Sequence, residues 1–465
     1  MARKESKEPI GGSFRDPEGF VFQRKGKIYR QINQAGKDNF NLLHSSGLYE
    51  HLTNNNWLTP HSQTKQVAAQ PKNSYKVIQP EEIFFLSYPY EWSFSQLKDA
   101  ALLTLDIQEA AIKHGMSLKD ASAYNVQFDI ESSSPIFIDT LSFELFETEK
   151  PWTAYRQFCQ HFLAPLALMA YSDQRFLQLM RTNIDGIPLD LAWKILPSKA
   201  IFGNGLFTHI YLHAKAQAAY AGSNEKRPTR RISMTLNQHL GILDGLRRSI
   251  SKLNQRSDLT EWANYYSETN YDDIAFKEKK ELVGKYLKLS KAQTVWDVGG
   301  NTGEFSRIAS QQGLPTISFD IDPNAIEANY ILTKQEQSTN ILPLVLDLTN
   351  PSPNLGWNNE ERISIYERKS PDMIFALALI HHMAISNNLP LERLASFFSK
   401  LAPWLIIEFV PKSDSQVKRL LSSRTDIFPE YTIEGFKRAF ATQFEIKESQ
   451  EILNSDRTLF LMKRK

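Results

Sequence analysis

Residues 295–305 have the sequence VWDVGGNTGEF, in which a short hydrophobic stretch runs into a glycine-rich turn and then into the start of a helix. Glycines in such a turn allow positive φ angles and let the backbone approach a ligand with no Cβ in the way. The N–H groups that begin the following helix favour an anionic or carboxylate group. By itself, the turn fits a dinucleotide site and equally a merely tight connection between two elements.

Two further carboxylates decide between these interpretations. Asp320 ends the predicted strand Thr316–Phe319, about twenty residues after the glycine-rich turn, which is the separation that one βαβ unit requires. An acidic side chain at that place can accept hydrogen bonds from both hydroxyls of a ribose. Asp347 closes the next predicted strand, where it can accept a hydrogen bond from an adenine amino group. Together with Asp297, these carboxylates are expected on one rim of the sheet, where open α/β folds bind ligands.

The rest of this region alternates strand and helix patterns. Such alternation predicts an α/β fold with a doubly wound, Rossmann-like parallel sheet and helices on both faces. The last two segments, Phe444–Glu448 and Thr458–Met462, have no helix between them, and the polar residues 454–456 suit an antiparallel hairpin. The other predicted strands are Thr294–Val298, Thr316–Phe319, Ile341–Leu346, Met373–Leu379 and Trp404–Phe409, and the predicted helices are Gly303–Gln312, Pro323–Thr333 and Leu389–Leu401.

Residues 297–303, DVGGNTG, resemble motif I of class I S-adenosylmethionine-dependent methyltransferases, with Asn301 in place of the usual middle glycine. The resemblance covers residues 257–465, and the terminal hairpin matches the reversed last strand of that family, which dinucleotide dehydrogenases lack. It implies that the glycine-rich turn surrounds the methionine part of the cofactor, that Asp320 binds the ribose, and that Asp347 and Leu348 flank adenine. No metal is expected in this domain. The implied cofactor-binding residues are Asp297, Gly299, Gly300, Asn301, Gly303, Asp320, Ile321, Asp347, Leu348 and Ala376.

Residues 375–383, FALALIHHM, form the fourth motif of the region. In the methyltransferase fold this segment emerges at the top of the fourth strand, beside the transferable methyl group. The small Ala376 and Ala378 would let the cofactor sulfonium lie close to the backbone. His381 or His382 could accept a proton from a hydroxyl or amine during methylation, and a capping or packing role fits either histidine as well. A histidine pair without a third nearby ligand is poor evidence for a metal site.

Two other segments border the predicted cofactor site. Trp262, Tyr265, Tyr266 and Tyr271 precede motif I; in related enzymes such a segment forms a lid over the cofactor, and plain core packing explains the aromatic residues equally well. Residues 408–412 follow the fifth predicted strand and face the same rim. We expect them to help shape the acceptor pocket.

The N-terminal part predicts an α+β domain. Gly19–Phe22 and Lys27–Ile32 suggest a hairpin, and a helix is predicted through Leu42, Leu48 and Leu52. Residues 118–126 and 135–139, LKDASAYNV and PIFID, resemble the catalytic and metal-binding loops of kinase-like folds, most closely the aminoglycoside phosphotransferases. The resemblance implies that one aspartate activates a hydroxyl while an asparagine and a second aspartate hold Mg²⁺ over the phosphates of ATP. The residues concerned are Asp120, Asn125 and Asp139.

This sequence departs from the phosphotransferase pattern in three ways. Leu118 stands where the family usually has histidine, Arg30 stands where a strand lysine is expected, and no convincing glycine-rich phosphate loop is present. Arginine binds phosphate but does not match the geometry of lysine. A hairpin in which the Asp and Asn residues form turns is the alternative.

The whole chain also resembles a group of NoeA-like nodulation methyltransferases. Residues 13–21, SFRDPEGFV, and residues 154–162, AYRQFCQHF, carry that likeness. It supplies no substrate. The organisation we predict is a recognition domain over residues 1–218, a linker with a connecting helix over 219–256, and a methyltransferase domain over 257–465.

Composition limits the remaining classes of protein. The 465 residues are 42% hydrophobic and 23% charged with a net charge of +2, which is typical of a soluble globular protein without a strong signal for nucleic acid or acidic membranes. The single Cys159 excludes an internal disulfide and suits a reducing cytoplasm. The N-terminus lacks the apolar core of a signal peptide. The longest apolar run, Phe162–Tyr171, is half of what crosses a bilayer and is expected to form a buried helix.

We therefore predict a cytoplasmic methyltransferase that uses S-adenosylmethionine on an unidentified acceptor, with an N-terminal domain that recognises the acceptor or an accessory ligand. One alternative is a bifunctional or primarily Mg-ATP-dependent phosphotransferase acting through the N-terminal domain. Another is a non-catalytic nucleic-acid-binding protein that uses the basic residues after Ala219, for which a solvated helix face is the simpler explanation. These basic residues are Lys226, Arg227, Arg230, Arg231, Arg247, Arg248, Lys252 and Arg256.

Overall fold

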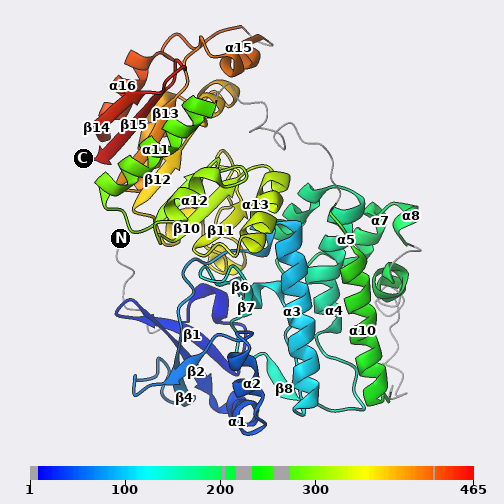
Figure 1. Cartoon of the computed structure of the whole chain (residues 1–465). Helices are drawn as coiled ribbons and strands as arrows, with labels where there is room; N and C mark the ends of the chain where they lie inside the picture. Colours follow the sequence, from blue (N-terminus) through cyan, green and yellow to red (C-terminus); the bar gives the residue numbers. More distant parts are fainter. Residues whose placement is uncertain (1–8, 202–204, 216–232, 256–272, 423–424) are drawn as a thin grey trace. The chain divides into compact units, whose positions relative to one another are not determined.

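A computed structural model describes the chain apart from residues 1–8, 202–204, 216–232, 256–272 and 423–424 (Figure 1). The chain forms two compact units. Each unit also includes one short segment that interrupts the sequence of the other unit. The first unit consists of Met1–Asp129, Ser134–Ser257 and Ser352–Ile363, and the second of Ile130–Ser133, Asp258–Pro351 and Ser364–Lys465.

The second unit is built on a seven-stranded sheet with the order β11-β10-β9-β12-β13-β15-β14. The first five of these strands are parallel, and β15 runs antiparallel between β13 and β14. The doubly wound sheet with a terminal antiparallel hairpin is thus confirmed. Its strands are β9 (Val295–Val298), β10 (Thr316–Asp320), β11 (Ile341–Val345), β12 (Met373–Ala376), β13 (Trp404–Phe409), β14 (Phe444–Glu451) and β15 (Thr458–Arg464).

Helices cover both faces of this sheet. Every residue of β9 and β12 is buried, as central parallel strands require. One face packs against α11 and α12, whose buried residues form a single cluster with Val295, Phe375 and Leu461. Phe460 points to the opposite face, because side chains alternate along a strand, and its ring lies 5.1 Å from Phe436 of α16. The helices are α11 (Asp273–Ser290), α12 (Glu304–Ser310), α13 (Pro323–Gln335), α14 (Leu391–Leu401), α15 (Ser415–Ser422) and α16 (Ile433–Ala441).

The element boundaries agree with the sequence prediction to within a few residues, with one informative exception. Strand β12 ends at Ala376, although its hydrophobic run continues to Leu379. The chain leaves the strand because Ala378 has a φ of +49°, a left-handed conformation that no strand contains.

The first unit contains a four-stranded antiparallel sheet with the order β1-β2-β4-β3, and the predicted first hairpin is confirmed. The helix predicted through Leu42, Leu48 and Leu52 is wrong: Gly47, with a φ of +78°, separates two helices. The elements in the sheet and beside it are β1 (Gly19–Arg24), β2 (Lys27–Asn33), β3 (His61–Gln63), β4 (Ser74–Pro80), α1 (Lys37–Ser45) and α2 (Leu48–Asn54).

The rest of the first unit is mainly helical, with two short pairs of strands. The predicted buried helix lies at the end of a helical stretch in which Cys159–Leu163 form a π-helical turn. The elements are α3 (Phe94–Lys113), β5 (Met116–Leu118), β6 (Val126–Phe128), β7 (Pro135–Phe137), β8 (Phe143–Leu145), α4 (Tyr155–Phe158), α5 (Ala164–Tyr171), α6 (Leu179–Thr182), α7 (Leu189–Ile195), α8 (Ser198–Ile201) and α10 (Leu236–Lys252). No helix among the described residues is long and apolar enough to cross a membrane.

Helix α10, in the stretch predicted to be a linker with a connecting helix, packs within the first unit. It lies alongside α3 (Figure 1), and Arg247 pairs with Asp106 and Glu109 of that helix. Leu243, Leu246 and Ile250 are buried, so the apolar stripe that suggested a helix also fixes where the helix packs.

The exchanged segments make specific contacts within the unit that they join. Residues 130–133 run along strand β11, where Asn340 donates a hydrogen bond to the carbonyl of Ile130 and Ser133 donates to that of Ile341. Residues 352–363 join the first unit through an ion pair of 2.6 Å between Arg15 and Glu361. Each predicted domain was one continuous stretch of sequence. The exchange of these segments was not predicted, because such short segments carry no periodic pattern.

Candidate cofactor site

The glycine-rich turn leaves the end of β9 at the middle of the sheet. The N–H groups of Gly299 and Gly300 both donate to the carbonyl of Phe319, at 2.8 and 2.9 Å, which anchors the turn on β10. Gly299, Asn301 and Gly303 have φ angles of +77°, +49° and +84°. Asparagine tolerates this left-handed region better than most residues, which explains how Asn301 can stand where related motifs have glycine.

Neighbouring side chains in the interior of the protein leave little room for a Cβ at two glycines of this turn. A Cβ on Gly300 would lie 2.6 Å from Oγ of Ser318, and one on Gly303 would lie 2.5 Å from Oδ1 of Asn329. Such distances are well below van der Waals contact. The absence of side chains therefore makes room for polar groups beneath the turn, a reason that the sequence alone did not show.

Asp320 links the turn to the next strand end. One carboxylate oxygen accepts a hydrogen bond from the N–H of Asn301 and the other accepts one from the N–H of Asp322, both at 2.9 Å. Burial raises the pKa of Asp320 to about 6. A carboxylate has about four acceptor sites, so Asp320 can accept a further hydrogen bond from a ligand at the rim.

Asp347 lies beside Asp320, because β10 and β11 are neighbouring parallel strands. The N–H of Leu346 donates to the carbonyl of Asp320 at 2.8 Å. One oxygen of Asp347 accepts hydrogen bonds from both the backbone and the hydroxyl of Thr349. Leu348 is half-buried, and the side chain of Ile321 is 58% exposed. The structure thus brings the turn and both strand-end carboxylates to one rim, as predicted; their roles toward a cofactor remain predictions.

Asp297 points into the protein rather than along the rim. It is 1% exposed, and one of its oxygens accepts a hydrogen bond of 2.7 Å from Oγ of Ser306 in α12. Burial, and to a lesser extent the charge of Asp320, raises the pKa of Asp297 to about 6. Its evident role in the fold is to hold the start of α12 against the end of β9.

The loop after β12 is held by a buried carboxylate, Glu408 of β13. One of its oxygens accepts a hydrogen bond of 2.7 Å from the N–H of Ala378 and forms an ion pair of 2.6 Å with Lys279 of α11. Its other oxygen lies 3.6 Å from Arg457. Glu408 was predicted to face the rim, but neither of its cationic partners was predicted. A charge within a hydrophobic strand was the available signal, since a buried charge needs a partner.

The two candidate bases lie in different surroundings. His381 is 1% exposed, and its Nδ1 has no hydrogen-bond partner among the described residues; burial and the nearby His382, Arg457 and Lys279 hold its pKa well below the usual range. His382 is half-buried, and burial together with Arg457 lowers its pKa to about 4. Both rings are therefore neutral at pH 7. His381 makes no side-chain capping bond, so capping does not explain it.

The chain is 34% identical to nodulation protein NoeA from Rhizobium meliloti (strain 1021), over 98% of this chain and 96% of NoeA. The chain belongs to the NoeA family. The similarity spans both units, so the resemblance predicted for the whole chain is confirmed. No family model matches the chain.

Two solved methyltransferase structures each resemble less than half of this NoeA-family chain. The N-methyltransferase NodS from Bradyrhizobium japonicum WM9, in complex with S-adenosyl-L-homocysteine, is 11% identical with a TM-score of 0.33, over 44% of this chain and 94% of NodS. Magnesium protoporphyrin IX methyltransferase (ChlM) from Synechocystis PCC 6803, with bound SAH, is 17% identical with a TM-score of 0.31, over 44% of this chain and 93% of ChlM. Because these scores are low, the description of the fold rests on strand order and pairing.

The predicted phosphotransferase residues of this NoeA-family chain lie close together in the first unit. Arg30 forms an ion pair with Asp139, whose oxygens also accept hydrogen bonds from Ser142 and from the N–H of Leu141. Burial raises the pKa of Asp139, but Arg30 and these hydrogen bonds outweigh it and leave the pKa below the usual value. Burial, and then the charge of Asp139, raises the pKa of Asp120.

These contacts give no support to a magnesium-ATP site. Asp120 and Asp139 each accept the N–H two residues further along, as the alternative interpretation of turn-forming residues expects. Asn125 donates to the hydroxyl of Ser142. No group of three His, Cys, Asp or Glu side chains in the described part of the chain could hold a metal ion. The kinase-like fold remains a prediction.

Two predicted features fall partly or wholly outside the described residues. The aromatic segment proposed as a lid, residues 262–271, is one of them. Of the basic residues proposed to contact nucleic acid, those from 226 to 231 and Arg256 are also outside. Arg247 and Arg248 are described, and both pair with carboxylates of α3 or of their own helix. This pairing favours the structural interpretation of that helix face.

Proposed function

We propose that the second unit binds S-adenosylmethionine at the rim formed by the ends of β9, β10 and β11, and that the protein transfers the methyl group of this cofactor to an acceptor. The observation that carries the proposal is the position of Asp320, whose two oxygens tie the glycine-rich turn to the second strand end. It lies in a sheet with a reversed strand β15 between β13 and β14, an arrangement that the methyltransferase resemblance implied and that dinucleotide dehydrogenases lack.

The residues at this rim fit the parts of the cofactor. Asp320 can accept a hydrogen bond from a ribose hydroxyl, because a carboxylate has about four acceptor sites. The second carboxylate oxygen of Asp347 can accept one from the adenine amino group. The exposed side chain of Ile321 and the half-buried Leu348 offer apolar surface to the adenine ring, and the backbone of residues 299–303 would surround the methionine part.

The cofactor, when bound, supplies an electrophilic methyl group on a sulfonium. The chain would contribute chiefly in-line positioning of the acceptor. Small residues and a left-handed turn at Ala378 shape the loop that would lie beside the methyl group. His382, neutral at pH 7 and half-buried, is the better placed of the two histidines to take a proton from a hydroxyl or amine. The first unit would recognise the acceptor or an accessory ligand.

A pair of variants tests the cofactor site. Asp320→Asn is expected to weaken S-adenosylmethionine binding on the order of ten- to a hundredfold, because hydrogen bonds to a charged group contribute about 1.5–3 kcal/mol each. Asp372→Asn is the matched control, because Asp372 also accepts hydrogen bonds from a backbone N–H and a hydroxyl. Asp372 lies just before β12, at the end of the sheet opposite to the rim. Calorimetric titration of both full-length variants measures the affinities. Equal affinities would contradict the assignment of Asp320.

A further inference from the structure

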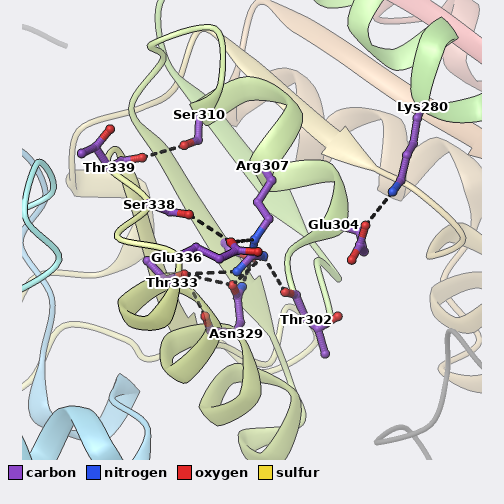
Figure 2. Close-up of polar contacts among 11 residues, drawn as sticks. Lys280, Thr302, Glu304, Arg307, Ser310, Asn329, Thr333, Glu336, Ser338 and Thr339 are labelled. Atoms are coloured by element: carbon purple, nitrogen blue, oxygen red, sulfur yellow. Dashed lines mark hydrogen bonds and ion pairs between the residues drawn. The ribbon is translucent and has the colours of Figure 1, made fainter.

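Arg307 lies beneath the glycine-rich turn, on the first helix after it. Its guanidinium donates hydrogen bonds to the carbonyl of Thr302 at 2.8 Å, to Oδ1 of Asn329 at 3.2 Å and to Glu336 at 2.8 Å (Figure 2). Its side chain is 11% exposed. A nearly buried arginine is therefore bonded directly to the backbone of the turn.

The turn and the arginine are matched in shape. A Cβ on Gly303 would lie 2.6 Å from Nη1 of Arg307, so glycine at position 303 leaves the guanidinium room to reach the carbonyl of Thr302. Asn329 also connects this arginine to the sheet, because its amide nitrogen donates to Oγ of Ser318 in β10 at 3.0 Å. The same hydroxyl occupies the space next to Gly300.

The turn is consequently held from both sides. Asp320 holds the N–H of Asn301 at the rim, and Arg307 holds the carbonyl of Thr302, the next residue, from below. The peptide group between Asn301 and Thr302 is therefore held on both sides and cannot rotate freely. Its N–H and C=O groups keep their directions before a ligand arrives, and such preorganisation lowers the entropic cost of binding.

Stability alone is a poor reason for an arginine at this place. Burying a charged group is costly, and a well-packed apolar residue of similar volume often leaves a protein equally stable or more stable. The position of the guanidinium against the turn, rather than only between α12 and α13, indicates a role in the shape of the turn.

We infer that Arg307 is a positioning residue that holds the glycine-rich turn in its cofactor-binding conformation without touching the cofactor. This inference rests on the proposed function, since it concerns affinity for S-adenosylmethionine. It assigns to Arg307 an effect on the whole turn. The affinities for S-adenosylmethionine and S-adenosylhomocysteine should therefore change by the same factor, because the two differ only at the sulfur.

The test uses calorimetric titration of the full-length chain with each of these two compounds. Arg307→Met is expected to weaken both affinities by about tenfold or more, the loss of one charge-assisted hydrogen bond, and Arg307→Lys by a smaller factor. Thr333→Val is the matched control. It removes the hydroxyl 3.5 Å from Nη2 of the same guanidinium but leaves the bond to Thr302, and it should bind as the wild type does.

A second readout needs no ligand. The N–H of Gly303 donates to the carbonyl of Gly300 at 2.8 Å, and hydrogen exchange of residues 299–305 should become faster in Arg307→Met and Arg307→Lys but not in Thr333→Val. Wild-type affinity in a folded Arg307→Met, or in Arg307→Lys if the first variant does not fold, together with unchanged exchange, would overturn the inference alone. Absence of binding by the wild-type chain would instead overturn the proposed function.

Discussion

Asp320 combines the two properties that a ribose-binding carboxylate needs. Hydrogen bonds from backbone N–H groups fix its orientation, and its position at the rim leaves the carboxylate able to accept a further bond. Its raised pKa shows the cost of this position, because burial penalises the ionised form. Ligand hydroxyls would compensate for part of the lost hydration.

The raised pKa predicts how cofactor binding depends on pH. Below about pH 6 the unliganded protein holds Asp320 protonated, so binding to the ionised form requires the release of a proton. The affinity for S-adenosylhomocysteine should be constant above pH 7 and fall by up to about tenfold per pH unit below pH 6. Calorimetric titrations between pH 5 and 8 measure this profile.

The Asp320→Asn variant separates this effect from other groups. Asp297 has a pKa of about 6 as well, and it still titrates in the variant. The affinity of Asp320→Asn should therefore be lower than that of the wild type at pH 7 and depend less steeply on pH. An equally steep profile in both proteins would show that Asp320 is not the group that titrates.

At the scale of secondary-structure elements, a buried ion pair joins α11, β13 and the loop after β12. Glu408 is 0% exposed and Lys279 is 2% exposed. Burial lowers the pKa of Lys279, and Glu408 opposes that shift. The same carboxylate fixes Ala378 in its left-handed conformation, so the pair determines where β12 ends and where the predicted methyl-transfer loop begins.

Removal of one partner should destabilise the fold strongly. Lys279→Met is expected to lower the free energy of unfolding by about 3–5 kcal/mol, because it leaves Glu408 buried beside a less direct partner. Lys280→Met, on the same helix, removes the partially exposed pair with Glu304 (Figure 2) and should cost about 1 kcal/mol or less. Urea unfolding followed by circular dichroism compares them.

A double variant shows whether charge is the cause. In Lys279→Met combined with Glu408→Gln, the amide oxygen still accepts the N–H of Ala378 and no uncompensated carboxylate remains, so most of the lost stability should return. If Lys279→Met proves no more destabilising than Lys280→Met, the pair does not hold these elements together.

At the scale of the whole molecule, the sequence predicted the features that repeat or that stand at element ends. Alternating hydrophobic runs predicted the parallel sheet, and carboxylates at strand ends predicted the rim of Asp320 and Asp347. Partners far apart in the chain were missed. Glu408 and Lys279 are 129 residues apart, and Arg307 resembles any other arginine on a short helix until its contacts with Thr302 and Asn329 are known.

The two exchanged segments were missed for a related reason. Residues 130–133 and 352–363 are short and irregular, and only the folded chain shows that each belongs with the other unit. The similarity to NoeA extends over nearly the whole chain, so the family shares both units and not the methyltransferase-like part alone.

The most direct test of the proposed function is calorimetric titration of the full-length protein with S-adenosylmethionine and, separately, with magnesium-ATP. We predict binding of one S-adenosylmethionine per chain and no binding of magnesium-ATP, since Arg30 already neutralises Asp139. Binding of magnesium-ATP without any binding of S-adenosylmethionine would contradict the proposal and make the phosphotransferase alternative the leading one.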